Sequence, residues 1–211
     1  MSRLTRWMAG FSSEDNYLKN KEQDQIKKVC RSEFINGQAC CEFASYKISN
    51  KTVSQIGCGV IALYNVERMM GKESNFSSLI KTMEQSNYVS FRGWLGIKVK
   101  GIKAYLLKQG YSIKVEKWWQ LIRNKIDLTS FSKEHSACLY GYAYCGWGNG
   151  RLLVGAHYVT FQKFDEKQSV IYNFADNQSF PIYTTNLRQQ LMGSGKKKWV
   201  QVPVCLIGIN N

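Results

Sequence analysis

The sequence has few prolines, few histidines and no long apolar run, and these shortages exclude several classes of protein. Its 211 residues include two prolines and two histidines. We find no tract of biased composition and no repeat at solenoid or propeller spacing, which argues against a fibrous, disordered or repeat protein. The longest apolar stretches, such as "RLLVGAHYVTF", end well short of the roughly 20 residues that a membrane helix needs. The sequence therefore predicts a folded globular chain without a membrane span.

The first residues, "MSRLTRWMAGFSSEDN", contain two arginines but no sustained apolar stretch behind them. A secretory signal peptide needs such a stretch. We therefore expect a cytoplasmic protein, or a bacterial protein exported by a route that leaves no conventional signal peptide.

The chain has seven cysteines, but they do not form the pairs that mark zinc sites. They lie at positions 30, 40, 41, 58, 138, 145 and 205. In a chain of this size without a secretion signal we expect reduced thiols. There is no CxxC pair, and His135, Cys138 and Cys145 match zinc-ligand spacing only loosely. We predict no metal and no other cofactor.

Basic residues outnumber acidic ones, and the net charge is +14. Such a surface attracts nucleic acid, anionic cell-wall polymer, acidic lipid or acidic peptide alike. The "GSGKKKW" stretch is not a phosphate-binding loop, because it lacks the earlier glycine and the Ser or Thr after the lysine. The charge is thus compatible with an anionic partner, but it does not identify one.

Helical patterns come first in the chain and strand patterns second. The helical patterns cover residues 16–30, 58–70, 75–87, 93–110 and 116–127. A short strand at 111–115 precedes the last of these, and later strand patterns cover 137–147, 156–164, 169–177 and 199–209. This order predicts an α+β fold in which a helical half packs on an antiparallel sheet, with a cleft between them. We divide the chain into a partly helical N-terminal extension, residues 1–50, and one domain, residues 51–211.

The stretch "SQIGCGVIALYNVERM" contains the first candidate for chemistry, Cys58. The thiol begins a predicted helix, where the helix dipole and the first backbone N–H groups lower a thiol pKa and can also bind an oxyanion. Gly57 and Gly59 would leave room for a substrate backbone to approach. A cysteine that merely packs in a core is the alternative.

A cysteine nucleophile needs a base, and only two histidines are present. His135 lies in a polar loop, "FSKEHSACLY", whereas His157 opens the strand "AHYVTFQKF". A base held on a strand is positioned more accurately than one on a loop. We therefore predict that His157 is the base.

A third residue should orient the imidazole, and the next predicted strand offers Asn173 and Asp176. If "DEKQ" closes a symmetric hairpin, His157 pairs with Asp176, and Asn173 reaches the ring only through a bulge or a strong twist. Geometry thus favours Asp176 but leaves Asn173 open.

Three segments together resemble a papain-like cysteine peptidase of the bacteriocin-processing, double-glycine type. They are "GCGVIALYN", "GWLGIKVKGIKAYLLKQGY" and "HYVTFQKFDEKQSVIYN", which lie in the family's order within residues 54–177. The resemblance implies a papain-like fold, cleavage of an amide by Cys58 with His157 as base, and Asn173 rather than Asp176 as the third residue. The family's oxyanion glutamine is missing, since Thr52 stands in its place, and Gln55 is the nearest substitute.

We therefore predict a cysteine peptidase that cleaves a peptide or protein substrate through an acyl-enzyme. Two alternatives remain. One is an amidase or transferase that acts on cell-wall peptide or on a protein of another cell. The other is an inactive basic module that binds nucleic acid or protein through a surface such as "KVEKWWQLIRNK".

Overall fold

The computed structural model describes residues 13–27, 34–90, 96–148, 151–175, 177–192 and 199–211. Its helices are α2 (Ser13–Lys27), α3 (Val53–Ile56), α4 (Cys58–Met69), α5 (Phe76–Gln85), α6 (Val99–Lys108), α7 (Trp118–Ile122), α8 (Leu128–Glu134) and α9 (Leu187–Met192). Its strands are β1 (Lys47–Ile48), β2 (Lys51–Thr52), β3 (Ser112–Glu116), β4 (Ala137–Gly148), β5 (Arg151–Lys163), β6 (Ser169–Tyr172), β7 (Ile182–Thr184) and β8 (Trp199–Asn210). None of the described helices is long and apolar enough to cross a membrane.

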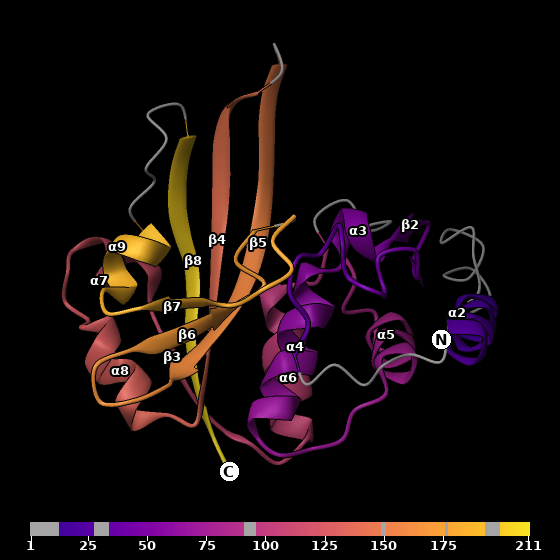
Figure 1. The fold of residues 1–211 in the computed structure, drawn as a ribbon, viewed down its shortest axis with the longest axis horizontal. Coiled ribbons are helices and arrows are strands. Elements are labelled where there is room, and N and C mark those ends of the chain that lie inside the picture. The colour runs from indigo at the N-terminus through magenta and orange to yellow at the C-terminus, as the bar shows by residue number, and fades with distance from the viewer. Residues whose placement is uncertain (1–12, 28–33, 91–95, 149–150, 176, 193–198) are drawn as a thin grey trace.

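Six strands form an antiparallel sheet in the order β3-β8-β4-β5-β6-β7. Helices α3 to α6 lie on one side of this sheet, next to β5 in the view of Figure 1. Helices α7, α8 and α9 lie on the opposite side. The predicted α+β fold, with helices before an antiparallel sheet, is confirmed.

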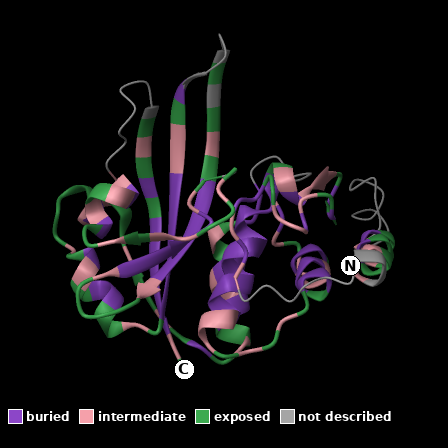
Figure 2. Ribbon diagram, in the orientation of Figure 1, coloured by how far each residue is buried: buried purple, intermediate pink, exposed green. Residues whose placement is uncertain are grey.

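Side chains from the sheet enter two separate apolar cores, because alternate residues of a strand point to opposite faces. Leu139 and Ile207 join the core that contains α4, α5 and α6, whereas Tyr140 and Leu206 join the core of α7, α8 and α9. Helix α4 is buried along most of its length (Figure 2). A helix that is apolar on nearly all sides is a central one, so α4 forms the rigid base of the helical half.

The region after residue 116 contains more short elements than the sequence indicated. The predicted helix at 116–127 is wrong in length, because α7 ends at Ile122. Asp127 then accepts hydrogen bonds from the N–H groups of Thr129 and Ser130 and begins α8, which the sequence did not indicate. Leu128 and Phe131 of α8 pack into the second core, and this burial stabilises a helix too short to be stable alone.

The hairpin of β5 and β6 differs from the symmetric one by one residue. Lys163 pairs with Ser169, and the ladder ends where Thr160 pairs with Tyr172. The symmetric register predicted for this hairpin is therefore wrong, and Asp176, which that register placed opposite His157, lies outside the described residues. Because β6 stops at Tyr172, Asn173 leaves the sheet and its backbone is free to turn back toward β5.

The N-terminal segment packs on the rest of the chain. Phe43, Tyr46 and Ile48 are buried in the same core as α4. Asn16 of α2 donates to the carbonyl of Ser49 and to Glu84 on α5. The domain boundary after residue 50 stays a prediction.

Candidate active site

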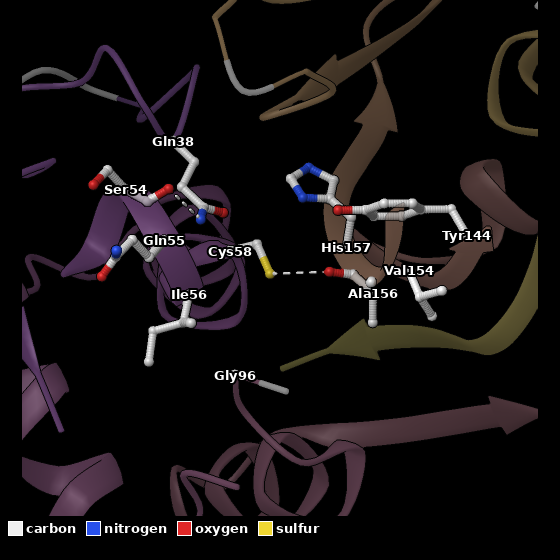
Figure 3. A pocket seen from close by; sticks show the side chains of 11 residues that line it. Gln38, Ser54, Gln55, Ile56, Cys58, Gly96, Tyr144, Val154, Ala156 and His157 are labelled. Carbon is white, nitrogen blue, oxygen red and sulfur yellow. Dashed lines mark hydrogen bonds between the residues drawn. The ribbon is translucent and has the colours of Figure 1, made fainter. Parts of the chain in front are cut away.

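A pocket of about 180 Å³ lies between the helical half and β5. Figure 3 shows the side chains around it. They are Gln38, Ser54, Gln55, Ile56, Cys58, Gly96, Tyr144, Val154, Gly155, Ala156 and His157. The pocket thus contains three of the residues that the sequence singled out for chemistry, Cys58, His157 and Gln55.

Cys58 is the first residue of α4 and is only 6% exposed. The backbone reaches it through a tight connection, because Gly57 ends α3 and directly precedes α4. The Cys58 Sγ lies 3.9 Å from the carbonyl oxygen of Ala156 on β5 (Figure 3). The thiol therefore faces the strand that carries His157, across the pocket.

His157 lies on β5 opposite Tyr142 of β4 and is held by a backbone carbonyl. Its Nε2 lies 2.7 Å from the carbonyl oxygen of Asn173. A carbonyl can only accept, so Nε2 carries the proton of the neutral ring and Nδ1 is the unprotonated nitrogen. The ring packs edge-on against Tyr142, 5.7 Å between centroids. This tautomer leaves Nδ1 as the nitrogen that can accept a proton.

Asn173 is completely buried and has a left-handed backbone, with φ of 57°. Asparagine tolerates this conformation better than most residues. Its N–H donates to Asn36 Oδ1 at 2.9 Å, and its Nδ2 donates to the carbonyl of Tyr158 at 3.3 Å. Asn173 therefore contacts His157 through its main-chain carbonyl. Asp176, the alternative, lies outside the described residues.

The two glutamines near Cys58 differ in orientation. Gln55 is exposed, and its Oε1 accepts from the N–H of Thr52 in a capping box at the start of α3. Gln38 is buried, and its Nε2 donates to the carbonyl of Ser54 at 3.1 Å. In Figure 3 the Gln38 amide lies near Cys58 and faces His157, while that of Gln55 points away.

The sequence analysis did not single out Gln38. It lies twenty positions before Cys58 (58 − 38), in the segment assigned to the N-terminal extension. Its Oε1 is buried without a hydrogen-bond partner among the described residues. No local pattern marks such a residue, because only the tertiary fold brings the segment to the pocket.

Gly57 and Gly59 are both buried, and neither lines the pocket. A Cβ on Gly57 would lie 2.6 Å from the carbonyl oxygen of Val53, and one on Gly59 would lie 2.7 Å from Cβ of Ile97. The space beside both glycines is therefore filled by the chain itself. They allow α4 to approach α3 and the loop before α6.

Cys138 and Cys205 are buried and Cys41 is half-buried, and burial disfavours the thiolate form of all three. It raises the pKa of Cys41 to about 11 and that of Cys205 to about 12. It also raises the pKa of Cys138. These three residues are thiols at neutral pH, so they provide internal references for the reactivity of Cys58. In the described part of the chain, His135, Cys138 and Cys145 do not form a cluster able to hold a metal.

No protein-family model matches the sequence. No curated protein matches it either. Among solved structures, the chain is similar to the peptidase domain of Streptococcus ComA, a bi-functional ABC transporter involved in a quorum-sensing pathway. The match has 15% identity and a TM-score of 0.38, and it covers 72% of this chain and 89% of that chain.

Proposed function

We propose that this protein is a thiol-dependent hydrolase that cleaves a peptide or amide bond through an acyl-enzyme on Cys58. One observation supports the proposal most. The thiol at the start of α4 and His157 line one pocket, and the bond from His157 Nε2 to the Asn173 carbonyl leaves Nδ1 to accept a proton. This is the arrangement of a nucleophile, a base and a group that orients the base.

In the proposed reaction, His157 Nδ1 takes the proton of Cys58, and the thiolate attacks the substrate carbonyl carbon. The C–N bond then breaks, and the imidazolium gives its proton to the departing amine. A water molecule next attacks the thioester, with His157 again as base, and the acid is released. The Asn173 carbonyl fixes the ring throughout and stabilises its protonated form.

Gln38 is the residue that we propose as the side-chain donor to the oxyanion. It is buried, and its amide faces the region between Cys58 and His157. Nε2 carries two hydrogens, so one can donate to the Ser54 carbonyl while the other donates to an oxyanion. The hydrogen bond from Gln38 Nε2 to the Ser54 carbonyl fixes the amide in this position. Backbone N–H groups in the first turn of α4 would add further donors. The exposed Gln55 instead caps α3.

The substrate that the site favours is an extended peptide. The pocket is bordered by Val154, Gly155 and Ala156 of β5, and this strand pairs with β6 only from Thr160 to Lys163. Peptides commonly bind by adding a strand to such a segment. A cell-wall peptide satisfies the same chemistry as a protein substrate.

The experiment that tests the proposal measures alkylation of each cysteine by iodoacetamide between pH 5 and 9, read by peptide mass spectrometry. We expect Cys58 to react well below pH 8, while Cys41, Cys138 and Cys205 lag because burial raises their pKa values. Cys58→Ala should abolish cleavage of a peptide library. A Cys58 that reacts no faster than Cys205 would rule out the hydrolase.

A second candidate function is binding of an anionic partner through the surface of α7. Trp118 is 52% exposed, and Trp119 lies beside three cations. The side-chain cations of Lys117, Arg123 and Lys125 lie 5.9, 5.8 and 5.9 Å from its ring centroid. Such binding should weaken steeply with added salt and should survive Cys58→Ala, the reverse of what hydrolysis should show.

A further inference from the structure

Residues 34–38, which we call the strap, connect the helix of Cys58 to the segment that holds His157. On one side the strap is fixed to α4. The N–H of Ile35 donates to Asn65 Oδ1, and Asn65 Nδ2 donates to the carbonyl of Ile35, each at 2.8 Å. Asn65 is fully buried on α4, so this pair of bonds ties the strap to the helix that Cys58 begins.

On its other side the strap contacts the end of β6 and the residues after it. The ring of Phe34 stacks on Tyr172 with 4.2 Å between centroids. Asn36 Oδ1 accepts from the N–H of Asn173. Gly37, at φ of 66°, lies so close that a Cβ there would be 2.8 Å from the carbonyl oxygen of Gln178. Within five residues the strap thus contacts both the helix that Cys58 begins and the segment whose carbonyl holds His157.

The bond from Asn36 acts directly on the residue whose carbonyl holds His157. Asparagine adopts the left-handed conformation at lower cost than most residues, so the contacts around it decide whether it keeps that conformation. At Asn173 the enforcing contacts are the bond from its N–H to Asn36 and the bond from its Nδ2 to Tyr158. If Asn36 were lost, the Asn173 N–H would lose its partner. The backbone would then relax toward ordinary φ values and turn the carbonyl away from His157 Nε2.

We propose that Asn36 is a positioning residue that fixes the tautomer of His157 through the Asn173 carbonyl. A catalytic role for Asn36 rests on the proposed function. Asn36 lies in a segment that precedes Cys58 by about twenty residues. It also makes the base and the oxyanion donor depend on one segment, because Gln38 lies two positions after Asn36. The N-terminal segment is therefore a part of the site.

The test is ¹⁵N NMR of the imidazole nitrogens in the full chain, where only two histidines give signals. The wild-type protein should show His157 protonated at Nε2 and unprotonated at Nδ1. Asn36→Ala should shift this pair toward a mixture of the two tautomers. It should also slow alkylation of Cys58 near pH 6.5 by about tenfold, the effect of one ordinary hydrogen bond. Asn36→Asp keeps an acceptor oxygen and should restore the Nε2-protonated ring.

Asn20→Ala is the matched control. Asn20, like Asn36, accepts a backbone N–H at its Oδ1, here that of Lys47, and its Nδ2 donates to the Lys47 carbonyl. It lies on α2, away from the pocket residues. This variant should lower the unfolding temperature and leave the nitrogen signals of His157 unchanged.

The proposal is overturned if folded Asn36→Ala retains the wild-type signals of His157 and the wild-type alkylation profile. If Asn36→Ala does not fold, hydrogen exchange of the Asn173 amide decides. Slow exchange of the Asn173 amide in both the wild type and Asn36→Asp supports its hydrogen bond to residue 36. Exchange of this amide in the wild type at the rate of an exposed amide refutes that bond. If Cys58 proves inert, the hydrolase fails, while the nitrogen signals still report on Asn36.

Discussion

Each of the two histidines has one ring nitrogen hydrogen-bonded to a backbone carbonyl, but the surroundings of the two rings differ. At the end of α8, His135 Nδ1 lies 2.8 Å from the carbonyl oxygen of Phe131. In the pocket, His157 Nε2 lies 2.7 Å from that of Asn173. Since a carbonyl only accepts, the two rings are opposite tautomers. The same rule thus leaves Nε2 unprotonated in one ring and Nδ1 in the other.

The surroundings of the second nitrogen decide what each ring can do. His135 lies between the ring of Phe131, 4.3 Å away between centroids, and the backbone of Gly208, where a Cβ would lie 2.4 Å from Nε2. His157 instead lines the pocket that contains Cys58. Both rings are oriented by a hydrogen bond to a carbonyl, but His157 shares a pocket with the Cys58 thiol, which is why it is the proposed base.

Replacing each histidine tests this comparison most strongly. His157→Ala should remove the rapid alkylation of Cys58 at low pH and should lower peptide cleavage by at least about 10³-fold, since the base is lost. His135→Ala should leave both rates unchanged and should cost only stability. Equal losses in the two variants would contradict the assignment. Alkylation kinetics and thermal unfolding measured on both proteins distinguish the outcomes.

The two glutamines near Cys58 provide the next contrast. Gln38→Ala should lower kcat by about 10²-fold to 10³-fold with little change in KM, because an oxyanion donor acts mainly in the transition state. Gln55→Ala should cost about 1 kcal/mol of stability through the lost capping box and leave kcat unchanged. Steady-state kinetics on a cleaved peptide measure both. If Gln55→Ala lowers kcat more than Gln38→Ala does, Gln55 rather than Gln38 is the oxyanion donor.

Gly208→Ala disturbs only the region of His135. The new Cβ would lie 2.3 Å from Cδ2 of that ring, so the ring must leave the sheet. We expect a loss of about 1–3 kcal/mol in the free energy of unfolding, the usual result of overpacking. The pH profile of Cys58 alkylation should stay as in the wild type. Urea unfolding together with that profile checks the prediction, and a shifted profile would show that the two regions are coupled.

The last prediction concerns the pH dependence of stability and leaves the chemistry of Cys58 untouched. Burial raises the pKa of Glu84 on α5 to about 7 from its usual 4.5. Between these values the folded chain keeps a proton that the unfolded chain has lost, so the free energy of unfolding should fall as pH rises from about 4.5 to 7.

Glu84→Gln should flatten this dependence while the alkylation profile of Cys58 keeps its midpoint. Urea unfolding at pH 5 and pH 8 measures the difference for both proteins. If the slope persists in Glu84→Gln, another group is responsible for it.

Local sequence predicted the elements that carry the chemistry. The apolar spacing after Gly57 predicts α4 with Cys58 at its start, and the helix predicted from residue 75 is α5, where Asn75 accepts from the N–H of Ser78. The alternating pattern around His157 predicts β5. These features depend on residues a few positions apart, where propensity and capping act directly.

Long-range features were missed or left open. The β5–β6 register is shifted by one residue from the symmetric hairpin, and a shift of one moves side chains to the other face. Helix α8 depends on packing of Leu128 and Phe131 against residues far away in the chain. Gln38 lines the pocket and Asn36 contacts Asn173 in a strap that Asn65 holds to α4.

The sequence by itself determined the α+β order, the place of Cys58 at a helix start and the place of His157 on a strand, because each follows from short-range periodicity. Tertiary structure alone decided which histidine faces the thiol, which glutamine lies beside it, and that Asn173 uses its carbonyl. Those outcomes depend on Asn173, which follows β6 and has a left-handed backbone. They also depend on the strap, more than a hundred positions away in the chain, where Asn36 Oδ1 accepts from the N–H of Asn173. Contacts of such separation leave no local pattern, since only packing of the whole chain brings them together.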